Sequence, residues 1–251
     1  MEIIQVNNLT KKFPVYGKFA EFQGYKYVLR NVSFSLDSEK CLGIIGESGS
    51  GKTTLARLLT GLLQPDAGII HLLGKDIREY CPKELSQTIQ LIFQNPLSSL
   101  NPKLSVQTIL SEAVAGSADS AGKISQVLKE VGLQENILRL YPGEISGGQA
   151  QRVAIARVLL KSAKIIIADE PLSALDVVTQ AQIILLFQQL LQQHKINLIF
   201  ISHDLLTTRY IAEQILVMSE GTVVEKGDCQ KIFQYPQHPY TRKLLAANIS
   251  L

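Results

Sequence analysis

The sequence has few cysteines and little net charge, and both shortages narrow the functions that it can serve. Its 251 residues include only Cys41, Cys81 and Cys229, with no CxxC pair and no cysteine–histidine cluster. This spacing supports neither a zinc site nor a disulfide framework, so we expect unpaired thiols in a reducing cytoplasm. The net charge of +3 is too small to favour nucleic acid or an anionic membrane surface as a partner. An anionic ligand therefore needs a local binding site.

Long apolar runs are also missing from the sequence. The longest are short segments such as residues 165–168 and 198–201, far below the ~18 residues that cross a bilayer. Residues 1–4 do not combine a basic segment with an apolar one, so we expect no signal peptide. With 46% hydrophobic and 19% charged residues, the composition is typical of a globular protein. Any role at a membrane is therefore expected to be peripheral.

The hydrophobic pattern predicts strands and helices in an α/β order. Residues 2–6 and 28–36 alternate apolar and polar side chains and predict two antiparallel strands, separated by a loop at 13–27. Short apolar runs predict strands at 41–45, 90–93, 165–168, 198–201, 215–218 and 222–225. Helical periodicity predicts helices at 53–63 and 180–193, and a turn is predicted at 64–68. After a stretch rich in proline, serine and asparagine at 95–102, helical patterns dominate to about residue 160, with breaks at 115–122 and 141–148. This order predicts an α/β core with an inserted helical subdomain.

Residues 46–53, GESGSGKT, fit the pattern G-x-x-x-x-G-K-[ST] of a phosphate-binding loop, between a predicted strand and a predicted helix. Glycines let backbone N–H groups curl around phosphate oxygens, and a helix N-terminus adds donors and a positive dipole end. The Lys52 ammonium is expected to reach the β and γ phosphates, and the Thr53 hydroxyl is expected to bind Mg²⁺. The residues predicted to hold the nucleotide here are Gly46, Ser48, Gly49, Ser50, Gly51, Lys52, Thr53 and Thr54.

A second motif ends the strand predicted at 165–168, where Asp169 and Glu170 follow the apolar run. Asp169 is expected to hold Mg²⁺, and Glu170 is expected to accept the proton of an attacking water. Two adjacent carboxylates next to a triphosphate are favourable when a metal ion neutralises part of their charge. Together with the phosphate loop, this motif predicts an enzyme that binds a nucleotide and Mg²⁺.

Further motifs resemble those of the ATP-binding cassette (ABC) ATPases. The run Ser146-Gly147-Gly148-Gln149 is similar to the family's LSGGQ signature, with Ile145 in place of the usual leucine. Gln94 follows Lys52 by 42 residues, as the family's Q-loop glutamine does. Residues 173–176, SALD, resemble the D-loop, and residues 201–204, ISHD, resemble the switch-histidine loop. The resemblance covers about residues 2–245, and its motifs follow the family's order.

The resemblance implies a role for each of these residues. Gln94 contacts Mg²⁺ and water, His203 contacts the γ-phosphate and holds the attacking water, and Asp176 orients groups across a dimer interface. The signature closes on ATP held by a partner, so that two ATP molecules are sandwiched between two subunits. An aromatic residue stacks on adenine; Phe13 fits this position, and Tyr16 is its rival. The implied catalytic residues are Glu170, His203, Gln94 and Lys52. The implied metal ligands are Thr53, Gln94 and Asp169. The implied contacts of the signature and the dimer interface are Ser146, Gly147, Gly148, Gln149 and Asp176.

Residues 93–102, FQNPLSSLNP, and residues 238–245, HPYTRKLL, resemble the oligopeptide, dipeptide and nickel importer branch of the family. This resemblance implies ATP hydrolysis coupled to uptake of peptides or nickel, at the cytoplasmic face of the inner membrane. The implied partners are a second ATPase subunit (a paralogue or a second copy), two integral membrane permeases and, indirectly, a substrate-binding protein. Because the cysteine-rich C-terminal segment of some branch members is not found, peptide and nickel both stay open as cargo.

The expected fold is a P-loop NTPase core of ABC type with an antiparallel β subdomain and an inserted α-helical subdomain. Within one nucleotide-binding domain, residues 1–94 and 161–230 are expected to form the ATP-binding core. Residues 95–160 are expected to form the helical signature subdomain, and residues 231–251 a short helical tail. The alternative functions are an ABC exporter or a drug or antimicrobial-peptide system, and an ABC ATPase acting on DNA or ribosomes. The small net charge disfavours the last of these.

Overall fold

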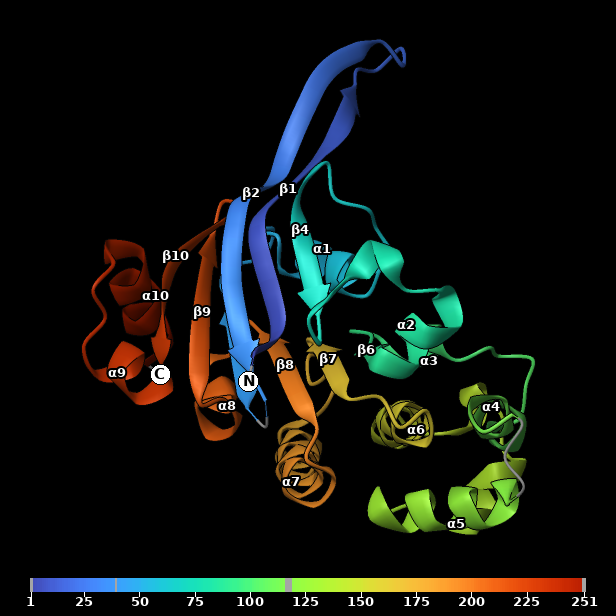
Figure 1. The fold of residues 1–251 in the computed structure, drawn as a ribbon. Helices are drawn as coiled ribbons and strands as arrows, with labels where there is room; N and C mark the ends of the chain where they lie inside the picture. The colour runs from blue at the N-terminus through green and yellow to red at the C-terminus, as the bar shows by residue number, and fades with distance from the viewer. Residues whose placement is uncertain (1, 39, 116–118, 250–251) are drawn as a thin grey trace. The chain divides into compact units, whose positions relative to one another are not determined.

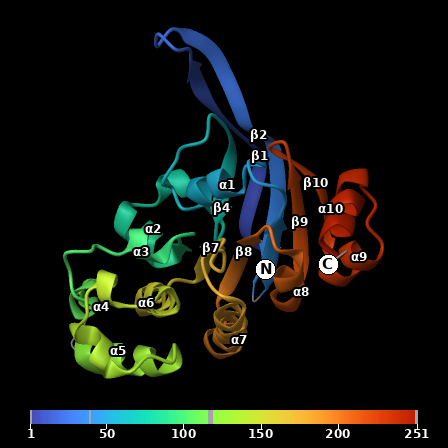
Figure 2. The same ribbon diagram turned by 180° about the vertical axis from the view of Figure 1, so that it is seen from behind.

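The structure is a computed structural model that describes residues 2–38, 40–115 and 119–249. Its chain forms two compact units (Figures 1 and 2). The first unit comprises Met1–Leu85 and Asn197–Leu251, and the second comprises Ser86–Ile196. The second unit is therefore inserted in the sequence of the first. Along the chain, the helix α2 (Pro82–Thr88) leads from the first unit to the second.

An antiparallel sheet forms one part of the first unit. Its strands are β1 (Glu2–Tyr16), β2 (Phe22–Asp37), β4 (Ala67–Leu72) and β5 (Lys75–Asp76), in the order β2-β1-β4-β5. The predicted antiparallel strands at 2–6 and 28–36 are confirmed. The loop predicted at 13–27 is wrong, because β1 and β2 continue through most of it as a hairpin that turns at residues 17–21.

The outer part of this hairpin is a two-stranded ribbon. β4 pairs with β1 only along Ile4–Thr10, and beyond that point β1 pairs with β2 alone. Both views show the ribbon extending past the end of β4 (Figures 1 and 2). An edge-to-face ring contact between Tyr16 and Phe22 stabilises it across the strands, and Phe22 also contacts the ring of Tyr25 within β2. Shifts of register along the hairpin break the alternation of the sequence, which is why the pattern did not reveal these strands.

The first unit also contains a set of strands that is parallel at its centre. β3 (Cys41–Ile45) lies between β8 (Asn197–Ser202) and β9 (Gln214–Ser219), and β10 (Thr222–Asp228) runs antiparallel to β9. Every residue of β3 and β8 is buried, as expected for parallel strands covered on both faces. The strands predicted at 41–45, 198–201, 215–218 and 222–225 are confirmed.

Short helices complete the first unit. They are α1 (Lys52–Leu59), the 3₁₀ turn η1 (Ile77–Glu79), α8 (Leu205–Ile211), α9 (Cys229–Gln234) and α10 (Pro239–Ile249). α1 ends earlier than the predicted helix at 53–63, because Gly61 has a left-handed φ of 71°. The turn predicted at 64–68 is shorter than expected, since β4 already starts at Ala67.

The second unit pairs two parallel strands, β6 (Ile89–Ile92) and β7 (Ile165–Asp169), with a group of helices. α6 (Gly147–Leu160) packs against α3 (Pro96–Ser99), α4 (Val106–Ala113) and α5 (Ser120–Glu130), and α7 (Val177–His194) follows β7 along the chain (Figure 1). Two 3₁₀ turns, η2 (Glu135–Arg139) and η3 (Pro142–Glu144), precede α6. The strands predicted at 90–93 and 165–168 and the helix predicted at 180–193 are confirmed.

The breaks predicted in the helical segment are shorter in the structure. α5 begins at Ser120 because the Asp119 carboxylate accepts a hydrogen bond from the Gly122 N–H and caps the helix. Residues 116–118 of the first predicted break lie outside the described residues. α6 likewise begins at Gly147, inside the second predicted break.

Among the helices that the structure describes, none combines the length and the hydropathy that a membrane span requires.

Candidate functional site

The phosphate loop and the switch histidine lie at the same edge of the parallel strands in the first unit. β3 and β8 pair in parallel, and Ile45 stands opposite Ser202 at their carboxyl ends. The next residues along the two strands are Gly46, which opens the phosphate loop, and His203. Ligands of α/β proteins commonly bind at this edge, outside the carboxyl ends of parallel strands. The fold thus brings together two motifs that are more than 150 residues apart in sequence.

The glycines of the phosphate loop occupy positions where a side chain is unfavourable. Gly46, Gly49 and Gly51 have φ angles of 155°, 81° and 104°. A Cβ at Gly51 would lie 2.8 Å from the Val28 carbonyl oxygen, and a Cβ at Gly46 would lie 2.2 Å from the Met218 carbonyl oxygen. Left-handed φ and close backbone approach both favour glycine. The loop therefore packs tightly against β2 and the end of β9.

Lys52 is buried at the start of α1, and its ammonium group is held by the loop itself. Its Nζ donates to the carbonyl oxygens of Gly46, at 2.7 Å, and of Glu47, at 2.9 Å. Two charge-assisted hydrogen bonds compensate the cost of burying this cation. They also hold the ammonium group against the loop, where an anion would gain from its charge.

Three observations test whether this loop fits phosphate groups. The Ser50 hydroxyl is buried and has no hydrogen-bond partner among the described residues. A Cβ added at Gly49 would meet no atom within 4 Å, so the loop is open at that position. The N-cap of α1 is a glycine, which has no side chain to occupy the first amides of the helix. An unpaired donor, an open loop and a buried ammonium group are together complementary to a polyphosphate.

His203 is exposed in the turn between β8 and α8. The next residue, Asp204, fixes this turn: its carboxylate accepts hydrogen bonds from the N–H groups of Leu206 and Thr207, and its own N–H donates to the Ser202 hydroxyl. The cap orients the first turn of α8 and therefore sets the direction in which the chain leaves β8. The position of the imidazole is thus determined by the strand before it and the helix after it.

In the second unit, the structure brings Gln94 and Glu170 into direct contact. β6 and β7 pair in parallel with Ile92 opposite Ala168, so both residues follow at the carboxyl ends of their strands. The Gln94 amide nitrogen donates to Glu170 Oε2 at 2.9 Å. Asp169, the last residue of β7, is buried. Gln94, Asp169 and Glu170 thus lie at the same edge of these two strands, and their roles stay predictions.

The backbone of Glu170 is strained. Its φ is 46°, in the left-handed region that residues other than glycine seldom adopt. Strained non-glycine residues cluster at functional sites, where the surrounding structure holds them in place. Here the strain turns the chain sharply after β7 and places the Glu170 carboxylate next to Gln94.

The predicted signature forms the N-terminus of α6. The Ser146 hydroxyl accepts a hydrogen bond from the Gln149 N–H at 3.2 Å, and Gln149 Oε1 accepts one from the Ser146 N–H at 2.9 Å. This reciprocal pair is a capping box. Ser146 and Gln149 are exposed, and Gly147 is half-buried. The start of the 14-residue helix therefore faces solvent with its N–H groups and a hydroxyl.

The D-loop residue Asp176 lies next to the signature. Its carboxylate caps α7 and accepts hydrogen bonds from the Thr179 hydroxyl, at 2.7 Å, and the Thr179 N–H, at 3.0 Å. These bonds lower the pKa of Asp176, the hydroxyl contributing most. A Cβ added at Gly148 would lie only 2.7 Å from Thr179 Cγ2. The glycine therefore allows the two helix N-termini to approach closely.

The two aromatic candidates for adenine stacking both lie on the hairpin. Phe13 is 36% exposed, and the Lys11 ammonium lies 5.4 Å from its ring centroid. Tyr16 is 60% exposed and contacts Phe22 farther along the ribbon. In the register of the hairpin, Phe13 is closer than Tyr16 to Val28, the residue whose carbonyl approaches the phosphate loop. This order favours Phe13 over Tyr16, and the assignment stays a prediction.

Of the residues predicted to hold magnesium, Thr53 belongs to the first unit, and Gln94 and Asp169 belong to the second. Within the described ranges, no group of three or more histidine, cysteine, aspartate or glutamate residues could hold a metal ion by itself. A magnesium ion that is shared with phosphate oxygens needs only one or two carboxylates from the protein. The donors present fit that kind of site, and the site stays a prediction.

Sequence reasoning missed one residue that contacts the phosphate loop. The Tyr240 hydroxyl, on α10, accepts a hydrogen bond from the Glu47 N–H at 3.1 Å. Tyr240 and Lys243 line a hollow of about 280 Å³ together with residues 47–50 of the loop and with Ser219 and Glu220. The only sequence signal was the HPYT segment itself, which the motif comparison tied to a family branch but not to the loop.

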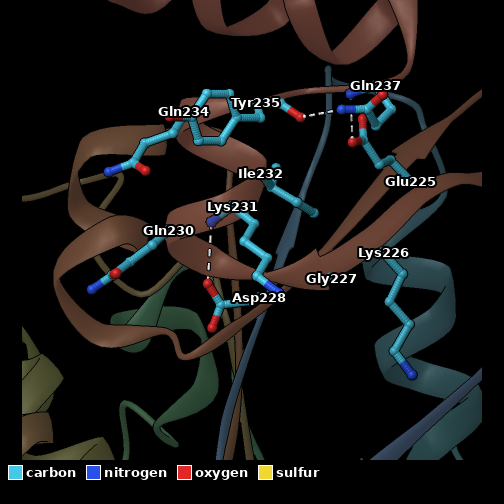
Figure 3. A pocket seen from close by; sticks show the side chains of 10 residues that line it. All are labelled: Glu225, Lys226, Gly227, Asp228, Gln230, Lys231, Ile232, Gln234, Tyr235 and Gln237. Carbon is cyan, nitrogen blue, oxygen red and sulfur yellow. Dashed lines mark hydrogen bonds between the residues drawn. The ribbon is translucent and has the colours of Figure 1, made fainter.

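A larger hollow, of about 750 Å³, lies on the C-terminal part of the first unit (Figure 3). It is lined by residues of β10 and α9 and by the segment that leads to α10, and none of the predicted site residues lines it. Figure 3 shows Glu225 turned toward Gln237, whose N–H donates to the carboxylate. This contact helps to fix the start of α10.

Comparison with known proteins gives a consistent result. A family profile described as ABC transporter matches residues 29–173. The oligopeptide transport ATP-binding protein OppF of Haemophilus influenzae is 40% identical over 258 residues, which cover 98% of this chain and 77% of that protein. The dipeptide transport ATP-binding protein DppF of Escherichia coli is 42% identical over 254 residues, which cover 98% of this chain and 76% of that protein.

Solved structures resemble this fold over most of its length. One of them is an ATP-binding cassette that was solved as a dimer in a post-hydrolysis state with ADP and Pi bound. Its TM-score is 0.79 and its sequence identity 27%, and the match covers 90% of this chain and 98% of that one. Another is CbiO1 of Clostridium perfringens, described as part of an ABC transporter complex. Its TM-score is 0.80 and its sequence identity 26%, and the match covers 93% of this chain and 91% of that one.

Proposed function

This chain belongs to the ABC transporter family, and from that premise we propose that it is the ATP-hydrolysing subunit of an importer that takes up dipeptides or oligopeptides. The observation that carries the proposal is the identity of 40% and 42% to two peptide-transport ATP-binding proteins over 98% of the chain. Nickel, the other cargo expected from the sequence, is kept as an alternative that the uptake assay below distinguishes.

The phosphate loop binds the β and γ phosphates of ATP in this proposal. Backbone amides of residues 48–54 surround the phosphate oxygens, and the Ser50 hydroxyl and Lys52 ammonium add donors from inside the loop. The unpaired, buried Ser50 hydroxyl and the open space at Gly49 support this role. Phe13 stacks on the adenine ring and orients the nucleotide along the hairpin.

Hydrolysis uses the residues at the carboxyl ends of β6, β7 and β8. Glu170 accepts the proton of the attacking water, Gln94 orients the water and the carboxylate, and His203 contacts the γ-phosphate. The 2.9 Å hydrogen bond from Gln94 to Glu170 supports the pairing of the first two. Thr53, Asp169 and Gln94 would hold a magnesium ion, which neutralises charge that develops on the phosphate oxygens.

A second ATPase subunit, either a paralogue or a second copy, completes the site in this proposal. The exposed N-terminus of α6 offers Ser146, Gly147, Gly148 and Gln149 to the ATP bound by the partner. Val177 and Val178, directly after Asp176, are 80% and 68% exposed, as expected of apolar residues that a partner covers. One of the similar solved structures is dimeric with ADP and Pi bound.

Two membrane permeases convert the closing and opening of this dimer into import, and a substrate-binding protein delivers the cargo to them. ATP binding joins the two subunits through donors from both, and hydrolysis removes the γ-phosphate contacts. The subunit is therefore proposed to work as a peripheral protein at the cytoplasmic face of the inner membrane, held there by the permeases.

Substitution Glu170→Gln tests the catalytic part of the proposal. Glutamine keeps an oxygen that can accept the hydrogen bond from Gln94, but it cannot accept a proton from water. ATP turnover is expected to fall at least about 100-fold, while ATP affinity stays close to that of the wild type. Gel filtration with ATP is expected to show a stable dimer. Glu112→Gln, the same change at an exposed position of the second unit, is the matched control. Unchanged turnover in Glu170→Gln would refute the assigned role.

An uptake assay tests the cargo. The subunit is co-expressed with its permeases and its binding protein, and uptake of labelled dipeptide, oligopeptide and nickel is measured in parallel. ATP-dependent peptide uptake that disappears with Glu170→Gln is the expected result. Uptake of nickel alone, or export of the labelled compounds, would contradict the proposed cargo or direction.

A further inference from the structure

We propose that Tyr240 is a positioning residue for the phosphate loop, and that the C-terminal helix α10 thereby sets the affinity for ATP. The inference rests on the proposed function of the loop, and it gives a role to the HPYT segment, which no part of that function uses. Its starting point is the hydrogen bond at 3.1 Å from the Glu47 N–H to the Tyr240 hydroxyl, which joins residues 193 positions apart.

Tyr240 and Lys52 hold the two ends of one peptide unit. The carbonyl oxygen of Gly46 accepts the hydrogen bond from Lys52 Nζ at 2.7 Å, and the N–H of the same peptide bond, on Glu47, donates to Tyr240. Because the peptide unit is planar, rotating it would break both contacts at once. The Tyr240 hydroxyl therefore restrains the carbonyl group that positions the Lys52 ammonium.

The side chains on either side of this peptide unit do little to restrain its orientation. Gly46, which precedes the bond, has a φ of 155° and lacks a side chain that would limit its rotation. Glu47 is exposed, and so are Ser48 and Gly49 after it. Without the tyrosine, the Glu47 N–H could hydrogen-bond to water in several orientations. A pre-organised loop avoids the entropic cost of ordering this segment when phosphate binds.

Tyr240 is itself held in place. The Glu225 carboxylate accepts a hydrogen bond from the Gln237 N–H at 2.8 Å (Figure 3). It also accepts one from the His238 N–H at 3.1 Å. His238 Nδ1 accepts a hydrogen bond from the Tyr240 N–H at 3.2 Å. The Arg242 guanidinium donates back to the carbonyl oxygens of Pro236 and Gln237.

These contacts form a chain of support from β10 to the phosphate loop. They fix the first turn of α10, so the tyrosine approaches the loop from a rigid base. The carboxylate of Glu225 is the anchor of this chain, because it accepts two backbone hydrogen bonds in the segment before the helix.

The substitution Tyr240→Phe removes the hydroxyl and leaves the ring. The dissociation constant for ATP and the KM of the ATPase are expected to rise about 3- to 10-fold, the range for loss of one hydrogen bond. The kcat is expected to change by less than about twofold, because the Tyr240 hydroxyl is bonded to the backbone of the loop and not to a residue assigned to hydrolysis. Tyr235→Phe is the matched control, since Tyr235 lies in the same segment and is 71% exposed. It is expected to leave KM and kcat unchanged.

A structural role alone would give another result. If Tyr240 only stabilised the fold, Tyr240→Phe would lower the unfolding midpoint and leave the KM unchanged. The substitution Glu47→Pro, which removes the N–H donor, tests the mechanism by a double-mutant cycle: adding Tyr240→Phe to it should raise KM no further. An additive increase, or a wild-type KM in Tyr240→Phe, would overturn the inference. Failure of the wild-type protein to bind ATP would instead overturn the proposed function.

Discussion

Lys52 is a buried cation whose charge is compensated by backbone carbonyl groups of the phosphate loop. Its ammonium group is almost fully buried, and two loop carbonyl oxygens accept its hydrogen bonds. A buried cation is stable only when such partners compensate its lost hydration. The same contacts leave the charge facing the loop, where phosphate groups of a nucleotide would lie. Stability of the loop and affinity for the ligand therefore depend on one side chain.

Substitution Lys52→Ala is expected to weaken ATP binding by about 10- to 100-fold, the range for losing hydrogen bonds to a charged group. The loss combines the missing ammonium with two carbonyl groups, on Gly46 and Glu47, that lose their donor. Isothermal calorimetry with a non-hydrolysable ATP analogue measures it. Lys129→Ala, the same change at an exposed position of α5, is the control. Equal affinity in both variants would exclude Lys52 from the binding site.

Single residues also show how far the sequence alone can predict the site. The phosphate loop, Asp169 and Glu170 could be predicted as site residues because their chemistry is encoded in consecutive residues. Gln94 and His203 needed the resemblance to a family, since a lone glutamine or histidine after a strand has no local signature. The Tyr240 contact could not be predicted, because it depends on where α10 packs.

At the scale of elements, the close approach of two helix N-termini shapes the signature region. Gly148, in the first turn of α6, faces the Thr179 methyl group of α7 at a distance that leaves no space for a Cβ. Thr179 cannot easily move away, because its hydroxyl and its N–H both hydrogen-bond to Asp176. Any side chain at position 148 must therefore displace the first turn of one helix.

Substitution Gly148→Ala is expected to destabilise the protein by about 1–3 kcal/mol through overpacking, and to lower ATP turnover. Urea denaturation and a steady-state ATPase assay measure the two effects. Gly143→Ala is the control, because a Cβ there would meet no atom within 4 Å. Its stability is expected to stay within about 0.5 kcal/mol of the wild type. Similar stabilities for the two variants would show that α6 and α7 accommodate the added methyl group without loss of stability.

The capping residue of α8 is the second element-scale feature. Asp204→Ala removes the acceptor for the N–H groups of Leu206 and Thr207, and loss of such a cap costs about 1 kcal/mol. Because the cap also fixes the turn that carries His203, ATP turnover is expected to fall with little change in ATP affinity. Asp204→Asn, which keeps an oxygen acceptor, is expected to restore most of both properties. Wild-type turnover in Asp204→Ala would show that the Asp204 cap does not position His203 for catalysis.

At the scale of the whole molecule, the three cysteines report on folding. Cys41 and Cys229 are buried, and Cys81 is exposed. Burial raises the pKa of the Cys41 thiol well above its usual value, with smaller contributions from Glu213 and Cys229, and burial likewise raises the pKa of Cys229. A thiol reacts through its thiolate form, so both buried groups are protected by inaccessibility and by protonation.

The folded protein is therefore expected to show one rapidly reacting thiol at pH 8, and the unfolded protein three. A chromogenic disulfide reagent with and without urea measures this, and Cys81→Ser is expected to remove the rapid phase alone. The slow reaction of the other two thiols reports the opening of the core around β3 and the start of α9. Rapid labelling of all three in the native protein would contradict the packing of the first unit.

The sequence by itself determined the strands that pair in parallel, several of the helices, and the motifs of the phosphate loop and the acidic strand end, because these follow from local hydrophobic periodicity and from side chains that are adjacent in the chain. It did not reveal β4 or β5. Only the tertiary structure decided the hairpin ribbon at residues 11–27, the contact of Gln94 with Glu170 and the support of the phosphate loop by Tyr240. Each of these depends on strand register or on helix packing between distant segments. Such contacts are set by the free energy of the whole fold, which no short stretch of sequence encodes.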